Sequence, residues 1–60
     1  MTLKELAGSF TTDVQFVLYK DGDVVSVADP IDLPDNPFYN SEISNFKAYC
    51  FKVTVRAELK

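Results

Sequence analysis

Histidine is absent from the 60-residue sequence, and this removes the side chain most often used for acid–base chemistry near neutral pH. Catalytic triads built around histidine are excluded for the same reason. Carboxylates remain, and two pairs lie close together in sequence, Asp21 with Asp23 and Asp32 with Asp35. A tight turn accounts for the first pair, because turns favour Asp next to Gly. We therefore expect a protein without enzyme activity and without catalytic residues.

Metal-binding chemistry has few candidate ligands in this sequence. Cys50 is the single cysteine, so the chain cannot form an internal disulfide. With no histidine and no second thiol, a zinc site also lacks enough ligands. Asp29, Asp32 and Asp35 offer oxygen ligands for Ca²⁺, but their spacing differs from the alternating ligands around the central glycine of an EF-hand. We interpret these carboxylates as solvated charges of a loop. Cys50 is interpreted as a small side chain packed inside the protein. We expect neither a metal ion nor a cofactor.

The C-terminal region carries a basic strip that could contact nucleic acid. Lys47, Lys52 and Arg56 lie near Phe46, and cations beside an aromatic ring are typical of surfaces that bind single strands. The whole chain, however, has 9 acidic against 6 basic residues, a net charge of −3, and phosphate contacts dominate affinity for nucleic acid. This balance disfavours nucleic acid as the partner. The solvated face of an amphipathic strand explains the same residues.

An acidic surplus marks the middle of the chain, where residues 13–42 hold seven acidic side chains and one lysine. Three prolines make residues 29–40 a loop, and long loops in small domains are often functional. Its carboxylates could imitate a phosphate backbone with apolar and aromatic anchors beside them, or they could simply keep the protein soluble. The candidate partner-binding residues are Asp29, Ile31, Asp32, Asp35, Phe38 and Tyr39.

A short N-terminal helix is the first element expected to position these groups. Thr2-Leu3-Lys4-Glu5 matches the capping box, in which Thr2 and Glu5 each bond the backbone amide of the other. Gly8-Ser9 then supplies a stop signal. One helical face is apolar, and it consists of Leu3, Leu6, Ala7 and Phe10. The helix survives only if this face packs on another element.

A β-hairpin is predicted next, with strands at Asp13 to Lys20 and Asp23 to Ala28. Asp21-Gly22 favours a two-residue type I′ turn, in which both positions have positive φ. If Lys20 pairs with Asp23, Leu18 faces Val25 and Phe16 faces Val27 on the core side, together with Val14. Tyr19 then faces Val24, and Val17 faces Ser26, on the opposite side. The candidate oligomer face consists of Val17, Tyr19 and Val24.

The C-terminal region shows the clearest alternation in the sequence. Phe51, Val53, Val55, Ala57 and Leu59 alternate with polar residues and predict a strand. Ile43 and Tyr49 share this phase, so residues 42–59 form either one long bent strand or two strands broken near Asn45 to Lys47.

The expected architecture is a single α+β domain over residues 1–60. A short N-terminal helix packs on a small antiparallel sheet that consists of the hairpin plus one or two C-terminal strands. A chain this short buries a thin core, so we expect a homodimer. The sequence has no signal peptide and no apolar run long enough to span a membrane, which predicts a cytoplasmic protein without membrane contact.

This order of elements, with Thr2-Leu3-Lys4-Glu5-Leu6 at its start and Phe51-Lys52-Val53-Thr54-Val55 near its end, resembles short uncharacterised proteins of bacteriophages and prophages. The resemblance covers most of the chain as a pattern and specifies no functional residue. It implies an accessory protein that binds a host factor, a class that includes anti-CRISPR inhibitors. We therefore expect a non-enzymatic protein-interaction module with a protein partner. One alternative is a nucleic-acid-binding accessory protein that uses the C-terminal basic strand. The other alternative is a structural subunit of a larger assembly.

Overall fold

The N-terminal helix α1 (Leu3–Gly8) begins and ends where the sequence predicts. The structure is a computed structural model, and it describes residues 1–10, 13–49 and 53–60. The Glu5 amide donates to Thr2 Oγ1 over 3.2 Å, and the Thr2 amide donates to Glu5 Oε1 over 2.9 Å, which confirms the capping box. Leu3 and Leu6 are buried beneath the helix, and Ser9 is its C-cap.

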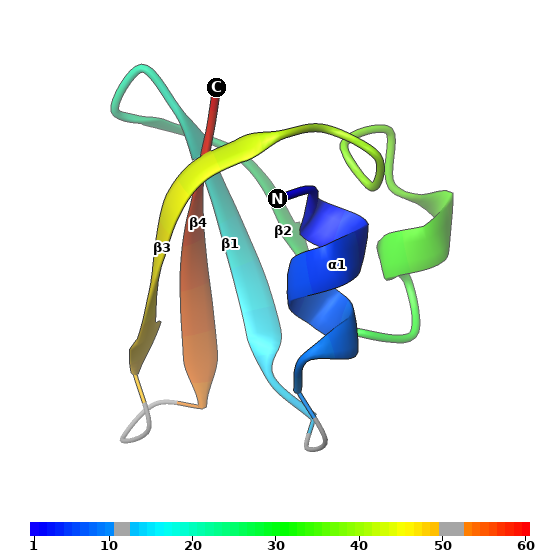
Figure 1. The fold of residues 1–60 in the computed structure, drawn as a ribbon. Coiled ribbons are helices and arrows are strands. Elements are labelled where there is room, and N and C mark those ends of the chain that lie inside the picture. The colour runs from blue at the N-terminus through cyan, green and yellow to red at the C-terminus, as the bar shows by residue number, and fades with distance from the viewer. Residues whose placement is uncertain (11–12, 50–52) are drawn as a thin grey trace.

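The described residues form a four-stranded mixed sheet in the order β2-β1-β4-β3 (Figure 1). Its strands are β1 (Gln15–Lys20), β2 (Asp23–Ala28), β3 (Ile43–Tyr49) and β4 (Thr54–Leu59). The α+β class is confirmed, but the prediction of a purely antiparallel sheet is wrong, because β1 and β4 are parallel. After β2 the chain crosses to the far edge of the sheet as β3. The antiparallel return β4 then enters between β3 and β1 and runs in the direction of β1.

The hairpin turn has the predicted geometry, with φ of 54° at Asp21 and 86° at Gly22, and Lys20 pairs with Asp23. Tyr19 pairs with Val24 as predicted, but the predicted partners of Leu18, Val17 and Phe16 are wrong because the pairing shifts between Leu18 and Tyr19. A bulge of this kind places an extra residue on one strand and reverses the alternation beyond it.

The bulge changes which β2 residues reach the core. Phe16 pairs with Ala28, Leu18 with Ser26 and Val17 with Val27, instead of the predicted partners. Ala28 is buried, whereas Val25 and Val27, both predicted on the core face, are 42% and 52% exposed. The hairpin therefore carries three exposed valines on its second strand, including Val24.

The C-terminal region is two strands, and the break falls between Tyr49 and Thr54 rather than at the predicted Asn45 to Lys47. A register shift between Ile43 and Asn45 also reverses the phase of β3. Ile43 is buried opposite Leu59, whereas Tyr49 pairs with Thr54 on the other face. Ile43 and Tyr49 therefore do not share a side, although they are an even number of residues apart.

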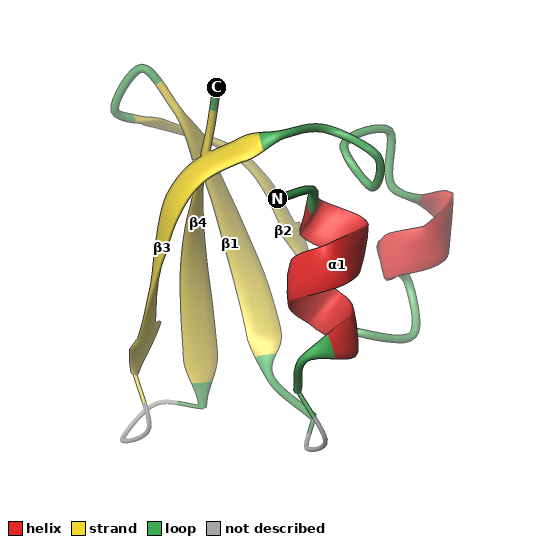
Figure 2. Cartoon of the chain, in the orientation of Figure 1, coloured by secondary structure: helices red, strands yellow, loops and turns green. Residues whose placement is uncertain are grey.

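The core lies between the sheet and the segments that cover one of its faces. Figure 2 shows α1 and the 3₁₀ helix η1 (Leu33–Asp35) against the strands. Leu33 is 1% exposed in the same cluster as Phe16, Leu18 and Leu6. Leu33 thus anchors the loop of residues 29–40 to the core, and Phe38 and Tyr39 pack against the same cluster. No helix among the described residues has the length and apolar character needed to cross a lipid bilayer.

Candidate functional site

The sheet face turned away from α1 is the candidate site, and we call it the open face. Side chains alternate between the two faces of a strand, so the neighbours of buried Phe16, Leu18, Val55 and Ala57 point away from the core. The strand pairing then assigns the members of the open face: Val17, Tyr19, Val24, Val27, Asn45, Lys47, Tyr49, Thr54, Arg56 and Glu58.

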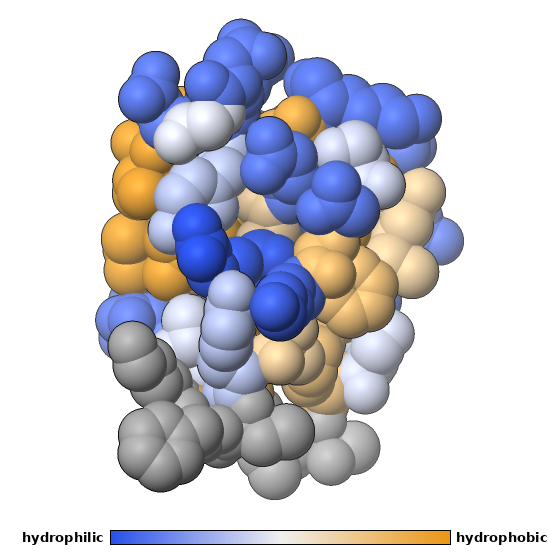
Figure 3. Space-filling model, turned by 90° about the vertical axis from the view of Figure 1, so that its left-hand side faces the viewer, coloured by the Kyte–Doolittle hydropathy of each residue, from blue (hydrophilic) through white to orange (hydrophobic). Residues whose placement is uncertain are grey.

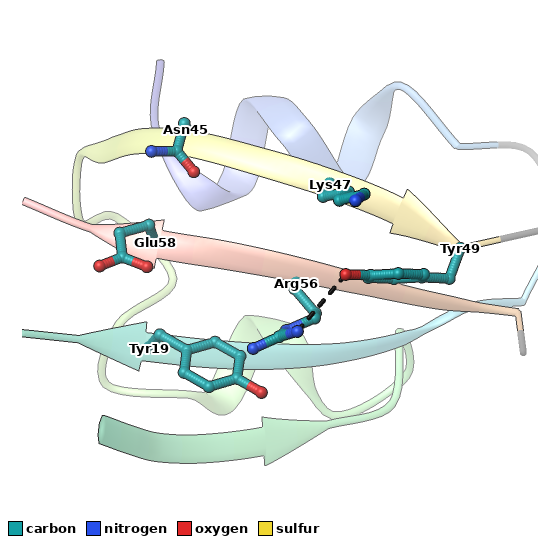
Figure 4. A pocket seen from close by; sticks show the side chains of 6 residues that line it. All are labelled: Tyr19, Asn45, Lys47, Tyr49, Arg56 and Glu58. Carbon is teal, nitrogen blue, oxygen red and sulfur yellow. Dashed lines mark hydrogen bonds between the residues drawn. The ribbon is translucent and has the colours of Figure 1, made fainter. Parts of the chain in front are cut away.

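Arg56 lies at the centre of this face, between two tyrosines (Figure 4). Its guanidinium carbon Cζ is 4.4 Å from the ring centroid of Tyr19 and 6.0 Å from that of Tyr49. Arg56 Nη1 also donates a hydrogen bond to the Tyr49 hydroxyl over 3.4 Å. Cation–π contact and the hydrogen bond together hold the guanidinium in one orientation. Three strands supply these side chains, so the cluster exists only in the folded sheet.

Lys47 adds a second positive charge beside Arg56. The two residues are cross-strand partners in the β3–β4 pair, and Lys47 Nζ is 5.3 Å from the Tyr49 ring centroid. Like charges directly opposite each other destabilise a sheet. Among the described residues the salt bridge joins the N-terminal ammonium to Glu42, so neither Lys47 nor Arg56 has a carboxylate partner there.

A shallow hollow of about 170 Å³ lies over this cluster. Its walls include both cations, both tyrosines, Asn45 and one carboxylate, Glu58. Figure 4 shows these side chains rising from β1, β3 and β4 on the same side of the sheet. The hollow therefore presents hydrogen-bond donors and a positive charge to whatever approaches the open face.

The hydrogen bond from Arg56 lowers the pKa of Tyr49, and the charges of Lys47 and Arg56 act in the same direction. The same hydrogen bond raises the pKa of Arg56. Both shifts arise because the bond is stronger when the phenol is ionised and the guanidinium keeps its proton. Arg56 thus stays charged over the whole physiological range.

Apolar surface borders the charged centre on β2. Val24 is 54% exposed and pairs with Tyr19, and Val27 pairs with the half-buried Val17. Figure 3, which views the molecule from the β3 side, shows strongly hydrophilic surface flanked by hydrophobic areas. The candidate oligomer residues Val17, Tyr19 and Val24 do lie on one face, but Tyr19 is also part of the Arg56 cluster.

The acidic loop, the surface that the sequence favours for a partner, has a different character. Ile31 is 86% exposed, and Asp29, Asp32 and Asp35 are exposed around it. Its aromatic residues Phe38 and Tyr39, in contrast, are half-buried and pack against the core. The two aromatic anchors are therefore partly used inside the molecule, and the loop stays a prediction as a binding surface.

The basic strip is only partly assembled as the sequence predicts. Lys47 and Arg56 share the open face, whereas Phe46 pairs with Ala57 and lies on the opposite face. Cys50, Phe51 and Lys52 lie outside the described residues. In the described part of the chain, no group of three acidic or thiol side chains is placed to hold a metal ion.

Sequence patterns alone do not reveal the tyrosine partners of Arg56. Tyr19 and Tyr49 are 30 positions apart in sequence, and they meet Arg56 only because β4 inserts between β1 and β3. The signal that could have found them is the combination of cations and tyrosines in the polar phase of three strands. Comparison with protein-family models, with curated proteins and with solved structures finds no match.

Proposed function

We propose that this protein is a non-enzymatic protein-interaction module that binds its partner through the open face. The observation that supports this most is Arg56, held between Tyr19 and Tyr49 at the centre of a sheet face that α1 leaves uncovered. Tyrosine and arginine are enriched among the residues that dominate binding energy at protein interfaces. A side chain already held in place loses little conformational entropy on binding.

The surroundings of the cluster also suit a protein partner. Protein interfaces are enriched in tyrosine and arginine and also bury apolar surface. The open face offers exposed Val24 and Val27 beside Tyr19, with Asn45 and Glu58 at the other end of the same rows of paired residues. A partner that covers the whole face buries apolar and charged groups together.

We propose a host protein as the partner, and inhibition of that protein as the outcome. The resemblance of the sequence to short phage proteins supports this assignment. A cytoplasmic location fits it, because a single unpaired cysteine is typical of a reducing compartment.

Self-association is the second part of the proposal. β2 is an edge strand that carries three exposed valines, and edge strands without charged or proline protection readily pair with another chain. Within β2 only the first residue, Asp23, is charged. We therefore propose a homodimer that forms along β2, which leaves the Arg56 cluster free for the partner.

Nucleic-acid binding is the second candidate function, and one observation favours it. Lys47 and Arg56 lie on the same sheet face as two tyrosines, the combination that single-stranded nucleic acids bind. Fluorescence anisotropy with labelled single-stranded DNA and RNA at low and high salt tests it. Binding that weakens steeply with salt would favour this candidate over a protein partner.

Affinity capture with the full chain tests the main proposal. Bait proteins are the unmodified chain, Arg56→Ala and the matched control Lys60→Ala, which also removes one positive charge but lies at the exposed C-terminal end. We expect one protein to be retained in stoichiometric amount by the unmodified chain and by Lys60→Ala, and to be lost with Arg56→Ala. Rebinding of that purified protein to the bait then has to reproduce the pattern. Equal retention by all three baits would reject the open face as the interface.

A further inference from the structure

The two positive charges of the open face, on Lys47 and Arg56, are not paired with carboxylates among the described residues, although the chain as a whole is acidic. The sequence holds 9 carboxylates, yet Lys47 and Arg56 face each other across the β3–β4 pair without a salt bridge among the described residues. Their mutual repulsion lowers the stability of the free protein. An anion that occupies the hollow between them would remove this cost.

The guanidinium of Arg56 is oriented to receive such an anion. Stacking on Tyr19 covers the flat side of the group, and the hydrogen bond to Tyr49 uses one of its five N–H donors. Hydrogen bonding to Tyr19 also contributes to the raised pKa of Arg56, and among the described residues no carboxylate forms a salt bridge with Arg56. The remaining donors lie in the plane of the guanidinium, where a carboxylate can bind with two parallel hydrogen bonds.

We propose that this hollow is a carboxylate-recognition site, which takes an Asp or Glu side chain from an acidic segment of the protein partner. This inference rests on the proposed function, because it assigns the chemistry of the same interface. Two cations and the carboxylate of Glu58 line the hollow, so its net charge of one positive unit matches a single monoanionic group. A volume of about 170 Å³ admits one side chain.

A nucleic-acid backbone fits the same hollow less well. Its phosphates repeat along the strand, whereas the hollow has a net charge of one positive unit and the whole chain has a net charge of −3. A second phosphate bound beside the first would be repelled by Glu58, which lines the same hollow. The open face is therefore complementary to one acidic side chain with apolar neighbours that can contact Val24 and Val27.

The test uses an acetylated and amidated peptide with one Glu among alanines as the probe, titrated into the ¹⁵N-labelled full chain and followed by NMR. We expect saturable shifts confined to the amides of residues 45–49 and 54–58. Arg56→Ala should weaken binding at least about tenfold, which corresponds to loss of a charged hydrogen bond. Arg56→Lys keeps the positive charge but lacks the paired N–H donors of the guanidinium. Its affinity for the peptide should lie between those of the unmodified chain and Arg56→Ala. Lys60→Ala should bind as the unmodified chain does.

Four results would overturn the inference: no saturable shift, equal weakening by Arg56→Ala and Lys60→Ala, tighter binding of oligothymidine, and tighter binding of inorganic phosphate than of the peptide. Amide dispersion of each variant shows that it is folded, and Lys47→Gln provides a second variant of the same hollow. If the single-Glu peptide does not bind while capture of a protein partner still depends on Arg56, the carboxylate site is wrong and the proposed function stands. If capture is independent of Arg56 as well, both are wrong.

Discussion

Arg56 lies over the ring of Tyr19, with its guanidinium carbon 4.4 Å from the ring centroid, while its Nη1 bonds the hydroxyl of Tyr49. One residue of β4 thereby joins the side chains of β1 and β3 on the face that α1 and η1 leave uncovered. The arrangement fixes a charged side chain that would otherwise sample many rotamers in water. A fixed arginine between tyrosines is what makes this face different from an ordinary solvated sheet surface.

Tyr49 should ionise at lower pH than it does in the Arg56→Ala variant. The hydrogen bond from Arg56 lowers the pKa of Tyr49 in the folded protein below the pKa of the same residue in the unfolded chain. The stabilisation linked to ionisation is therefore present only above the ordinary tyrosine pKa and is lost as the pH falls through the folded value. At neutral pH it is absent. Ultraviolet titration of the phenolate in both proteins measures the difference, and identical curves would mean that the hydrogen bond does not form.

Replacing Lys47 by Glu should stabilise the fold while it weakens partner binding. The substitution converts a like-charge pair into an opposite-charge pair across β3 and β4. We expect the melting temperature to rise by about 2 °C. A stabilising change that removes function is typical of residues kept for binding. Thermal denaturation and partner capture on the same preparation check it, and a fall in melting temperature would contradict the placement of the two cations.

Leu33 should be essential for stability, whereas its loop neighbour Ile31 should not. Leu33 is 1% exposed and Ile31 is 86% exposed, although both are large aliphatic residues of the same loop. Leu33→Ala should lower the free energy of unfolding by about 2 to 5 kcal/mol, and Ile31→Ala by no more than about 0.5 kcal/mol. Urea denaturation of the two variants measures this directly. Similar losses in both would show that the loop is not anchored as described.

A side chain at Gly22, the second residue of the hairpin turn, should lower the stability of the fold. Gly22 has φ of 86°, a left-handed conformation that costs a residue with a β-carbon about 1 to 2 kcal/mol. Gly22→Ala should destabilise by that amount even though the added methyl group meets no other atom. Asp21→Asn is the matched control, because Asn also accepts positive φ, and it should be close to neutral. An unchanged Gly22→Ala protein would exclude the type I′ turn.

Val27 should control self-association. The side chain is 52% exposed on the edge strand β2, and Val17 separates it from Arg56 in the same row of paired residues. Val27→Lys places a charge on that edge and should convert the proposed dimer into a monomer, with little effect on folding. Sedimentation equilibrium over a range of micromolar concentrations measures the mass. If the unmodified chain is already a monomer throughout that range, the dimer proposal fails.

Local patterns were enough to predict the helix, the turn and most strand positions. The capping box at Thr2 and Glu5 and the positive φ values of Asp21 and Gly22 depend on residues only a few positions apart. Such features are decided by short-range hydrogen bonds and backbone sterics, so they can be read before the fold is known.

Long-range features were predicted less well, because they depend on strand register and strand order, which the alternation of apolar residues does not determine. The bulge beside Leu18 reverses the faces of β2 and exposes Val25 and Val27, although alternation alone places them in the core. No glycine or proline marks the bulge. The grouping of Tyr19, Tyr49 and Arg56 was missed for the same reason, since these residues meet only because β4 pairs with both β1 and β3.

Hydrogen–deuterium exchange with the captured and purified partner tests whether the open face is the interface, because it compares two surfaces of one molecule. The open face and the acidic loop of residues 29–40 are carried by different segments, so their protection can be read separately. We expect slower exchange in residues 45–49 and 54–58 when the partner binds, and unchanged exchange in residues 29–40. Protection of the loop without protection of β3 and β4 would contradict the account.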